Sequence, residues 1–314
     1  MSVSRVKQKW SHRINVVTIG SEDRAVTVGG ETTLPFLHDE GEMPNRPVIA
    51  LEVYDRAPDT WTDVLMDALG DVVNDPVAWA KKGQDEWGVD LISLRLTRHA
   101  DEEDPASPAE CAELAKSVLE AVDLPIIVWG SGETGPDNKM YPVVSQALAG
   151  QNCLLGSATE DSYKTLAATC IADGHSLIGE SPIDINICKQ VNILVSDMGM
   201  PLERVVIYPT NGALGYGLEY AYSILERTRL AALGGDKLMS MPILVNIGPE
   251  VQRAKEAKAL ASEFPEWGSE EERGILWEAV TATIYLQAGA DILTMCHPEA
   301  IAQVRSYIDQ MQTD

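Results

Sequence analysis

Polar side chains and glycines gather where the short apolar runs of this 314-residue chain end. Glu52 and Asn246 lie within two such runs, and the segments 130–135 and 209–217 follow two others. Hydroxyl and amide groups bind neutral polar ligands, and glycine lets a ligand approach the backbone closely. This collection favours a site for a large neutral ligand. A flexible loop is an equally good interpretation of the glycines in 209–217.

The run ends lack several groups on which common enzyme chemistry depends. No lysine stands in or at the end of a run, so a Schiff-base aldolase would lack its nucleophile. The nearest cysteines, Cys153 and Cys170, are too far apart for the paired ligands of an iron–sulfur cluster or structural zinc. Glu133 and Glu180 could share acid–base work, or could be ordinary solvated acids. We therefore assign no catalytic residue and no metal ligand, and expect the five cysteines to be buried free thiols.

Composition excludes two classes of partner. The formal net charge is -24 and the pI is near 4.5, which disfavours binding to nucleic acid or to an anionic membrane surface. The longest apolar runs, such as 124–129, are far shorter than a membrane-spanning helix requires. The basic N-terminal segment is not followed by the apolar region of a signal peptide, so we expect a cytoplasmic protein.

From residue 47 onward the sequence repeats a short apolar run, a polar turn and a helical segment. The runs are rich in Ile, Val and Leu with little alternation, as in strands covered on both faces. Their number predicts a (β/α)8 TIM barrel, and the rival is a doubly wound open sheet, which lacks its glycine fingerprint here. The runs are 48–53, 91–96, 126–129, 153–156, 176–178, 205–208, 243–247 and 292–295.

Helix starts are marked by capping residues. Ser107 and Glu110 form a capping box around Pro108, and Asp75 precedes another proline. Ser181 before Pro182 and Thr159 before two acids predict two further helix starts.

The N-terminal segment follows a different pattern. Residues 14–19 and 25–28 are apolar and flank the turn-forming residues 20–23, which predicts a β-hairpin. We expect this hairpin to plug the N-terminal mouth of the barrel. The chain would then consist of an N-terminal extension, residues 1–46, and the barrel, residues 47–314.

Several motifs, spread over nearly the whole chain, resemble the small subunit of the corrinoid iron–sulfur protein. This is the delta-subunit family of the acetyl-CoA decarbonylase/synthase system. The segments 181–186 and 208–217 are the specific ones, whereas the Gly–Gly–Glu–Thr element at 29–32 alone would not be. The other segments that carry the resemblance are 49–54 and 75–81.

The resemblance implies a TIM barrel paired with a large subunit that holds the [4Fe–4S] cluster and most contacts to a cobamide. The cobamide would take a methyl group from methyltetrahydrofolate through a separate methyltransferase. It would deliver that methyl group to carbon monoxide dehydrogenase/acetyl-CoA synthase in the reductive acetyl-CoA pathway. The small subunit would cap the corrin with its barrel mouth, without catalytic activity of its own.

The chemistry of the corrin indicates which residues would face the cobamide. The corrin rim carries amides, which pair with Asn and Thr, and neutral side chains offer the cobalt no competing ligand. We expect the contacts to come from the sixth-run loop and two other run ends. These residues are Thr134, Thr210, Asn211, Gly212, Ala213, Leu214, Gly215 and Asn246.

Two further interpretations concern the same barrel. A pterin-binding methyltransferase with its own active site is the alternative function, because Asn211, Asn246, Glu52 and Glu133 could imitate the strand-end acids and amides of such barrels. An interface with a large subunit should expose aromatic side chains. Among the tryptophans, Trp267 is the best candidate for that interface.

Overall fold

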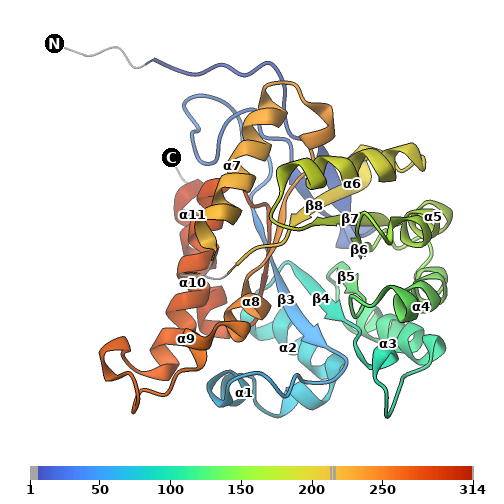
Figure 1. The fold of residues 1–314 in the computed structure, drawn as a ribbon, viewed down its shortest axis with the longest axis vertical. Helices are drawn as coiled ribbons and strands as arrows, with labels where there is room; N and C mark the ends of the chain where they lie inside the picture. The colour runs from blue at the N-terminus through green and yellow to red at the C-terminus, as the bar shows by residue number, and fades with distance from the viewer. Residues whose placement is uncertain (1–5, 213, 215–216, 313–314) are drawn as a thin grey trace.

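The computed structural model describes residues 6–212, 214 and 217–312, and these form the predicted (β/α)8 barrel (Figure 1). All pairs within the barrel sheet are parallel, in the order β8-β7-β6-β5-β4-β3-β10-β9. A bridge between Ile207 and Ile243 joins the two edge strands. The barrel strands are β3 (Val48–Tyr54), β4 (Leu91–Arg95), β5 (Ile126–Trp129), β6 (Leu154–Ala158), β7 (Ser176–Ser181), β8 (Val205–Pro209), β9 (Leu244–Asn246) and β10 (Ile292–Met295).

Helices cover the outside of the barrel and follow the strands in sequence (Figure 1). The connection from β9 to the next covering helix is long. Its first short helix, residues 247–253, lies against the barrel mouth, and the part that follows, which contains a second short helix, protrudes from the barrel. The helices are α1 (Asp63–Leu69), α2 (Pro76–Trp87), α3 (Pro108–Ala121), α4 (Thr134–Ala147), α5 (Tyr163–Asp173), α6 (Ile185–Asp197), α7 (Leu218–Leu233), α8 (Ile247–Arg253), α9 (Lys255–Lys258), α10 (Glu270–Ala288) and α11 (Pro298–Gln312).

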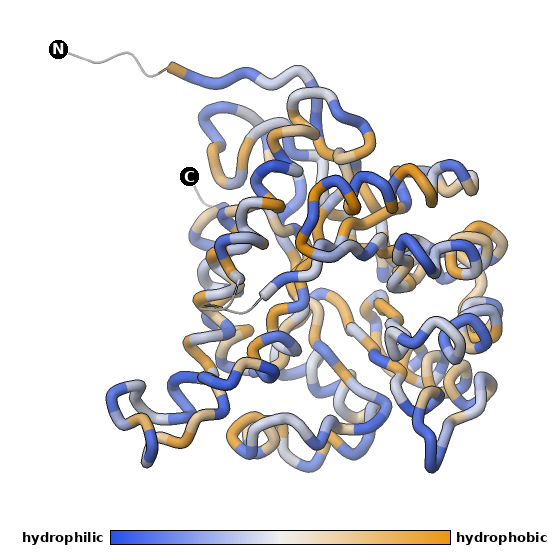
Figure 2. Tube along the Cα trace, in the orientation of Figure 1, coloured by the Kyte–Doolittle hydropathy of each residue, from blue (hydrophilic) through white to orange (hydrophobic). Residues whose placement is uncertain are grey.

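Side-chain alternation along β3 separates two cores. Ile49, Leu51 and Val53 pack in the large cluster between the strands and the helices. Val48 and Ala50 belong to the cluster that fills the barrel interior. Both faces of β3 are apolar over most of its length, so its sequence is a nearly continuous apolar run. The barrel strands accordingly contain hydrophobic stretches in Figure 2.

The N-terminal hairpin has the predicted strands, β1 (Val16–Ile19) and β2 (Val26–Gly29), paired antiparallel. Its Val17, Ile19 and Val28 are fully buried in the same cluster as the inward side chains of the barrel strands. The hairpin therefore closes the N-terminal end of the barrel. The division of the chain into residues 1–46 and 47–314 stays a prediction.

Two of the four predicted helix starts are confirmed and two are wrong. Ser107 and Glu110 form the capping box of α3, and Asp75 caps α2. Ser181 instead ends β7, because Asp184 accepts the first backbone N–H groups of α6. Thr159 lies in the turn before α5, whose N-cap is Ser162.

Among the described residues, none of the helices is long and apolar enough to span a membrane.

Candidate functional site

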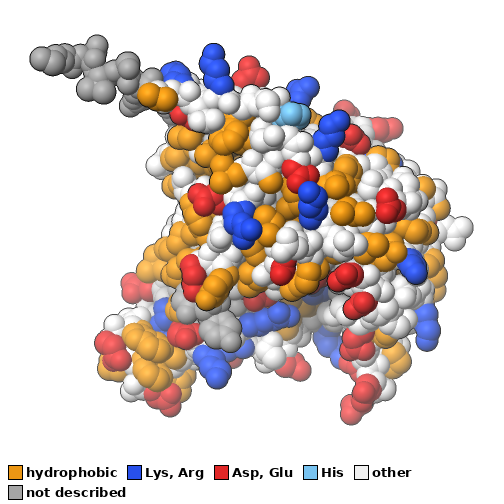
Figure 3. All heavy atoms as spheres, turned by 45° about the horizontal axis from the view of Figure 1, so that its top comes forward, with side chains coloured by type: hydrophobic (Ala, Val, Ile, Leu, Met, Phe, Trp, Pro, Cys, Tyr) orange, Lys and Arg blue, Asp and Glu red, His pale blue; other side chains and the backbone are white. Residues whose placement is uncertain are grey.

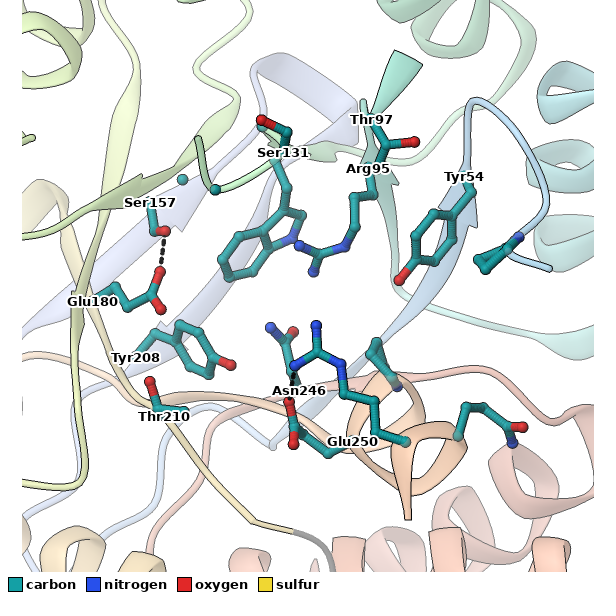
Figure 4. Close-up of a pocket in the computed structure, with 18 of the residues that line it drawn as sticks. Tyr54, Arg95, Thr97, Ser131, Ser157, Glu180, Tyr208, Thr210, Asn246 and Glu250 are labelled. Carbon is teal, nitrogen blue, oxygen red and sulfur yellow. Dashed lines mark hydrogen bonds and ion pairs between the residues drawn. The ribbon is translucent and has the colours of Figure 1, made fainter. Parts of the chain in front are cut away.

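A cavity of 370 Å³ opens at the C-terminal mouth of the barrel, where the working residues of this fold lie (Figure 4). Strand ends and the loops after them supply its walls. Its aromatic side chains are Tyr54, Trp61, Trp129 and Tyr208, and its charged side chains are Arg95, Glu180, Glu250 and Arg253. Its remaining side chains with polar groups are Thr60, Thr97, Ser131, Ser157, Thr210, Asn246 and Gln252.

Arg95 at the end of β4 is held by a buried network. Its Nε donates to Glu52 Oε1 at 2.5 Å, and Ser93 Oγ donates to the other Glu52 oxygen at 2.7 Å. Trp129 Nε1 donates to Ser93 Oγ at 2.9 Å. The guanidinium also lies against the rings of Trp129 and Tyr54, with its Cζ 4.8 and 5.8 Å from their centroids. This network fixes the guanidinium at the floor of the cavity.

Glu180 brings a second fixed charge to the cavity from β7. Ser157 Oγ donates a short hydrogen bond to Glu180 Oε2, which orients the carboxylate (Figure 4). The Tyr208 ring lies edge-on to the Trp129 ring, with centroids 5.5 Å apart. Burial, and then the nearby carboxylates of Glu180 and Glu250, raise the pKa of Tyr208, so its phenol stays neutral at physiological pH.

Glu250 in α8 lies on the remaining wall and is paired with Arg253 at 3.0 Å. Burial raises the pKa of the Glu250 carboxyl above its usual value, and Arg253 opposes that shift. Asn246, only 4% exposed, lies beside Tyr208 and Glu250 in Figure 4, and its Oδ1 has no hydrogen-bond partner among the described residues.

The cavity contains two of the expected ligand-facing residues, Thr210 and Asn246. Asn211 lies behind its wall, 1% exposed, where its Nδ2 donates to the Asn246 carbonyl and its Oδ1 accepts from the Asn246 N–H, at 3.0 and 3.1 Å. Asn211 therefore ties the end of β8 to the end of β9 and positions Asn246.

The other expected contacts lie around the cavity or outside the described residues. Thr134 borders a smaller pocket of 110 Å³ that shares Ser157 and Glu180 with the cavity. The carbonyl of Gly212 accepts from Tyr285 Oη at 2.5 Å, and Leu214 is half-buried in the following turn. Ala213 and Gly215 lie outside the described residues. The contact of all these residues with a cobamide stays a prediction.

The expectation of a neutral cavity wall is wrong, because four charged side chains line it. Arg95 is the principal residue that the sequence reasoning missed. A signal was present: Ser93 and Arg95 alternate with Ile92 and Leu94 in one run, so the two polar residues must face the same side.

The four residues considered for the pterin-binding alternative do not face one common site. Glu52 is used by Ser93 and Arg95, and Asn211 by the backbone of Asn246. Glu133 is exposed before α4 and does not line the cavity. Only Asn246 of this set lines it.

The five cysteines are buried and free, as predicted. Within the described parts of the chain, no three His, Cys, Asp or Glu side chains are placed to hold a metal ion. Trp267 is 42% exposed and stacks on Phe264, with centroids 4.3 Å apart, in the segment after α9. Figure 3 shows hydrophobic side chains gathered on that segment, at lower left, and its role as an interface stays a prediction.

Solved structures that share this fold include dihydropteroate synthases. The enzyme from Coxiella burnetii, in complex with pteroic acid, has a TM-score of 0.58, 11% identity, and coverage of 95% of this chain and 98% of that chain. The enzyme from Xanthomonas albilineans has a TM-score of 0.57, 14% identity, and coverage of 89% and 98%. At this identity the likeness concerns the fold alone, and the chain is a TIM-barrel protein with a polar cavity at its C-terminal mouth.

Sequence comparison identifies the family. The model of the CO dehydrogenase/acetyl-CoA synthase delta subunit matches residues 16–301. The acetyl-CoA decarbonylase/synthase complex subunit delta of Methanopyrus kandleri is 36% identical over 294 residues, 93% of this chain and 72% of that protein. The subunit delta of Methanosarcina mazei is 33% identical over 309 residues, 95% and 70% of the two chains. The chain belongs to this delta-subunit family.

Proposed function

We propose that this chain is the small subunit of a two-subunit corrinoid iron–sulfur protein and covers a cobamide with its barrel mouth. The methyl group would come from methyltetrahydrofolate through a separate methyltransferase and leave to carbon monoxide dehydrogenase/acetyl-CoA synthase. A large partner subunit would carry the [4Fe–4S] cluster, in a cytoplasmic complex. The chain itself would not be a catalyst.

The observation that carries this proposal is the composition of the mouth cavity in a chain of the delta-subunit family. Among its described lining residues none is His, Cys, Met or Lys, so no strong competing ligand for cobalt faces the opening. Donors and acceptors are both present, in Arg95 and Glu180, and aromatic rings flank them. These groups fit the amide-bearing rim of a corrin.

When bound, a cobamide supplies a cobalt centre that accepts and releases a methyl group. The residues of this chain would bind the rim, orient it and exclude water from the covered face. Arg95 would donate hydrogen bonds, and the orphaned Asn246 amide oxygen would accept one. The fixed network behind Arg95 would keep that donor in place without a large entropic cost on binding.

The first test is anaerobic purification of the tagged chain from its native source, with co-purifying mass and visible spectrum recorded together. We expect an equimolar larger partner with corrinoid and iron–sulfur absorption. A colourless chain, alone or homo-oligomeric, would contradict the proposal. Tight binding of methyltetrahydrofolate by that isolated chain would favour the pterin-binding methyltransferase.

A paired substitution tests the orientation of the barrel. Thr60 is exposed at the edge of the cavity and makes no side-chain hydrogen bond to the described residues, so Thr60→Trp adds bulk at the mouth without removing a contact. Glu120→Trp adds similar bulk on α3, beside the hairpin at the other end of the barrel. We expect T60W to lower the corrinoid content of the purified complex while the partner remains bound, and E120W to leave it unchanged. Equal corrinoid content in both variants would exclude this orientation.

A further inference from the structure

The donors in the mouth cavity are fixed before any ligand arrives. Arg95 uses its Nε for Glu52, and its Nη1 and Nη2 have no protein acceptor among the described residues. The guanidinium is confined by the Trp129 and Tyr54 rings. Figure 4 shows it extending into the cavity. Two parallel N–H donors are therefore available to an oxygen atom of a ligand.

Acceptors are available in the same cavity. Glu180 has one oxygen held by Ser157, and its Oε1 has no protein donor among the described residues. Asn246 is more than nine-tenths buried and lines the cavity, yet its Oδ1 also lacks a partner in the described part of the chain. A buried polar oxygen without a partner costs free energy, so a ligand N–H that reached it would be favoured.

The balance of charge selects the ligand class. Arg95 is compensated by Glu52 at 2.5 Å and Arg253 by Glu250 at 3.0 Å. Glu180 is then the lining carboxylate that has no cationic partner among the described residues. A carboxylate ligand would be repelled by Glu180, and a cationic ligand, although Glu180 would attract it, would offer no acceptor to the free Arg95 N–H groups. A neutral group that both donates and accepts, with its oxygen toward Arg95 and its NH2 toward Glu180, satisfies both.

We propose that this cavity is a receptor for a primary carboxamide arm of the corrin rim, and that Glu180 makes it reject the corresponding carboxylate. This inference rests on the proposed function. The cavity volume of 370 Å³ is near the lower end for drug-sized ligands, so it can hold a side arm but not the macrocycle. Glu180 is thus a specificity-determining residue for amidated corrinoids.

The probes that test this are cobalamin and its three monocarboxylic acids, in each of which one propionamide arm has been hydrolysed. Binding to the corrinoid-depleted complex of this chain with its partner is followed by absorption spectroscopy. One of the three acids should bind at least about tenfold more weakly than cobalamin. In that acid, the hydrogen bond from the amide NH2 to the Glu180 carboxylate is lost, and a second carboxylate faces Glu180 instead. In the Glu180→Gln variant that acid should recover at least half of the lost affinity on a logarithmic scale.

Glu120→Gln is the matched control, because it removes one negative charge from an exposed side chain at the other end of the barrel. It should leave the discrimination unchanged. Ser157→Ala removes the hydrogen bond that orients the Glu180 carboxylate and keeps the carboxylate itself. It should weaken the discrimination between cobalamin and that acid, and it replaces E180Q as the test if E180Q does not fold. Equal binding of all three acids and cobalamin, or equal recovery in E180Q and E120Q, would overturn the inference. Failure of cobalamin itself to bind the complex would instead overturn the proposed function.

Discussion

Glu52 is the carboxylate on which the floor of the mouth cavity depends, and its removal should be costly. It is fully buried, and its two oxygens accept from Arg95 and Ser93 at 2.5 and 2.7 Å. Glu52→Leu leaves the Arg95 guanidinium without its counter-charge in the barrel interior and deprives Ser93 of its acceptor. We expect this variant to fold with reduced stability and a displaced Arg95.

The size of the effect follows from burial. Removing one partner of a buried ion pair costs about 3–5 kcal/mol. The Arg95 side chain is 18% exposed, so water compensates part of this and the lower end, about 3 kcal/mol, applies. With an unfolding entropy of roughly 2.1 cal/mol/K per residue over 314 residues, this lowers Tm by about 4–5 °C. Glu52→Gln keeps a hydrogen-bond acceptor and should cost less, about 1–2 kcal/mol.

The assay is urea denaturation at pH 7, followed by far-ultraviolet circular dichroism and tryptophan fluorescence. The double variant E52L/R95M, which replaces the whole pair by apolar side chains, should be more stable than E52L, because the uncompensated charge is gone. The single variant R95M completes the cycle. An E52L variant within about 0.5 kcal/mol of the wild type, or additive effects in the cycle, would refute this account of the network.

Three other predictions concern residues around the barrel. Burial raises the pKa of Glu278 from 4.5 to about 7, so the folded state retains a proton that the unfolded state loses as the pH rises past 4.5. The contribution of Glu278 to the free energy of unfolding is complete below pH 4.5 and is lost as the pH approaches 7. The stability of the wild type relative to Glu278→Gln should therefore fall by about 3 kcal/mol over that range in urea titrations, and a flat difference would contradict this. Asn211→Ala should lose about 2–3 kcal/mol with both hydrogen bonds to Asn246. Asn211→Asp should lose at least as much, because a buried carboxylate oxygen would face the Asn246 carbonyl that Nδ2 now serves; a loss below about 0.5 kcal/mol in either variant would argue against this tie. Ile19→Ala removes a buried side chain of the hairpin and should lower the free energy of unfolding by about 2–4 kcal/mol. Val16→Ala, whose side chain is exposed, should lower it by less than about 0.5 kcal/mol in the same urea titrations. Similar losses in the two variants would mean that the hairpin does not plug the barrel.

The fold could be predicted because each barrel strand is buried on both faces. In β3 the outward residues meet helices and the inward residues meet the hairpin, so almost every position is apolar. The helix starts were harder to predict than the strands, for a local reason. Ser181 and Asp184 are both capping residues within one turn of each other, and only the continuation of β7 through Ser181 decides between them. Strand length is a tertiary property that capping patterns do not contain.

The candidate site was predictable to the extent that side-chain direction follows from strand alternation. Thr210 and Asn246 follow or end strands and line the cavity, and Arg95 could have been found by the same rule. Asn211 could not. One residue after Thr210 its side chain turns away and binds the backbone of a neighbouring strand, a choice set by the loop conformation and not by residue type.

The charged residues change the reason why this mouth would suit the corrinoid that we propose it covers. A cover for a reactive metal does not have to be neutral at every side chain. It needs to lack strong metal ligands, and most of its charges need to be paired. The described lining residues include no His, Cys, Met or Lys, and both arginines are paired with carboxylates. Glu180, held by Ser157, is the lining charge that no described residue compensates. The same residue that leaves the cavity slightly negative is therefore the one that, in our proposal, would distinguish an amide from an acid.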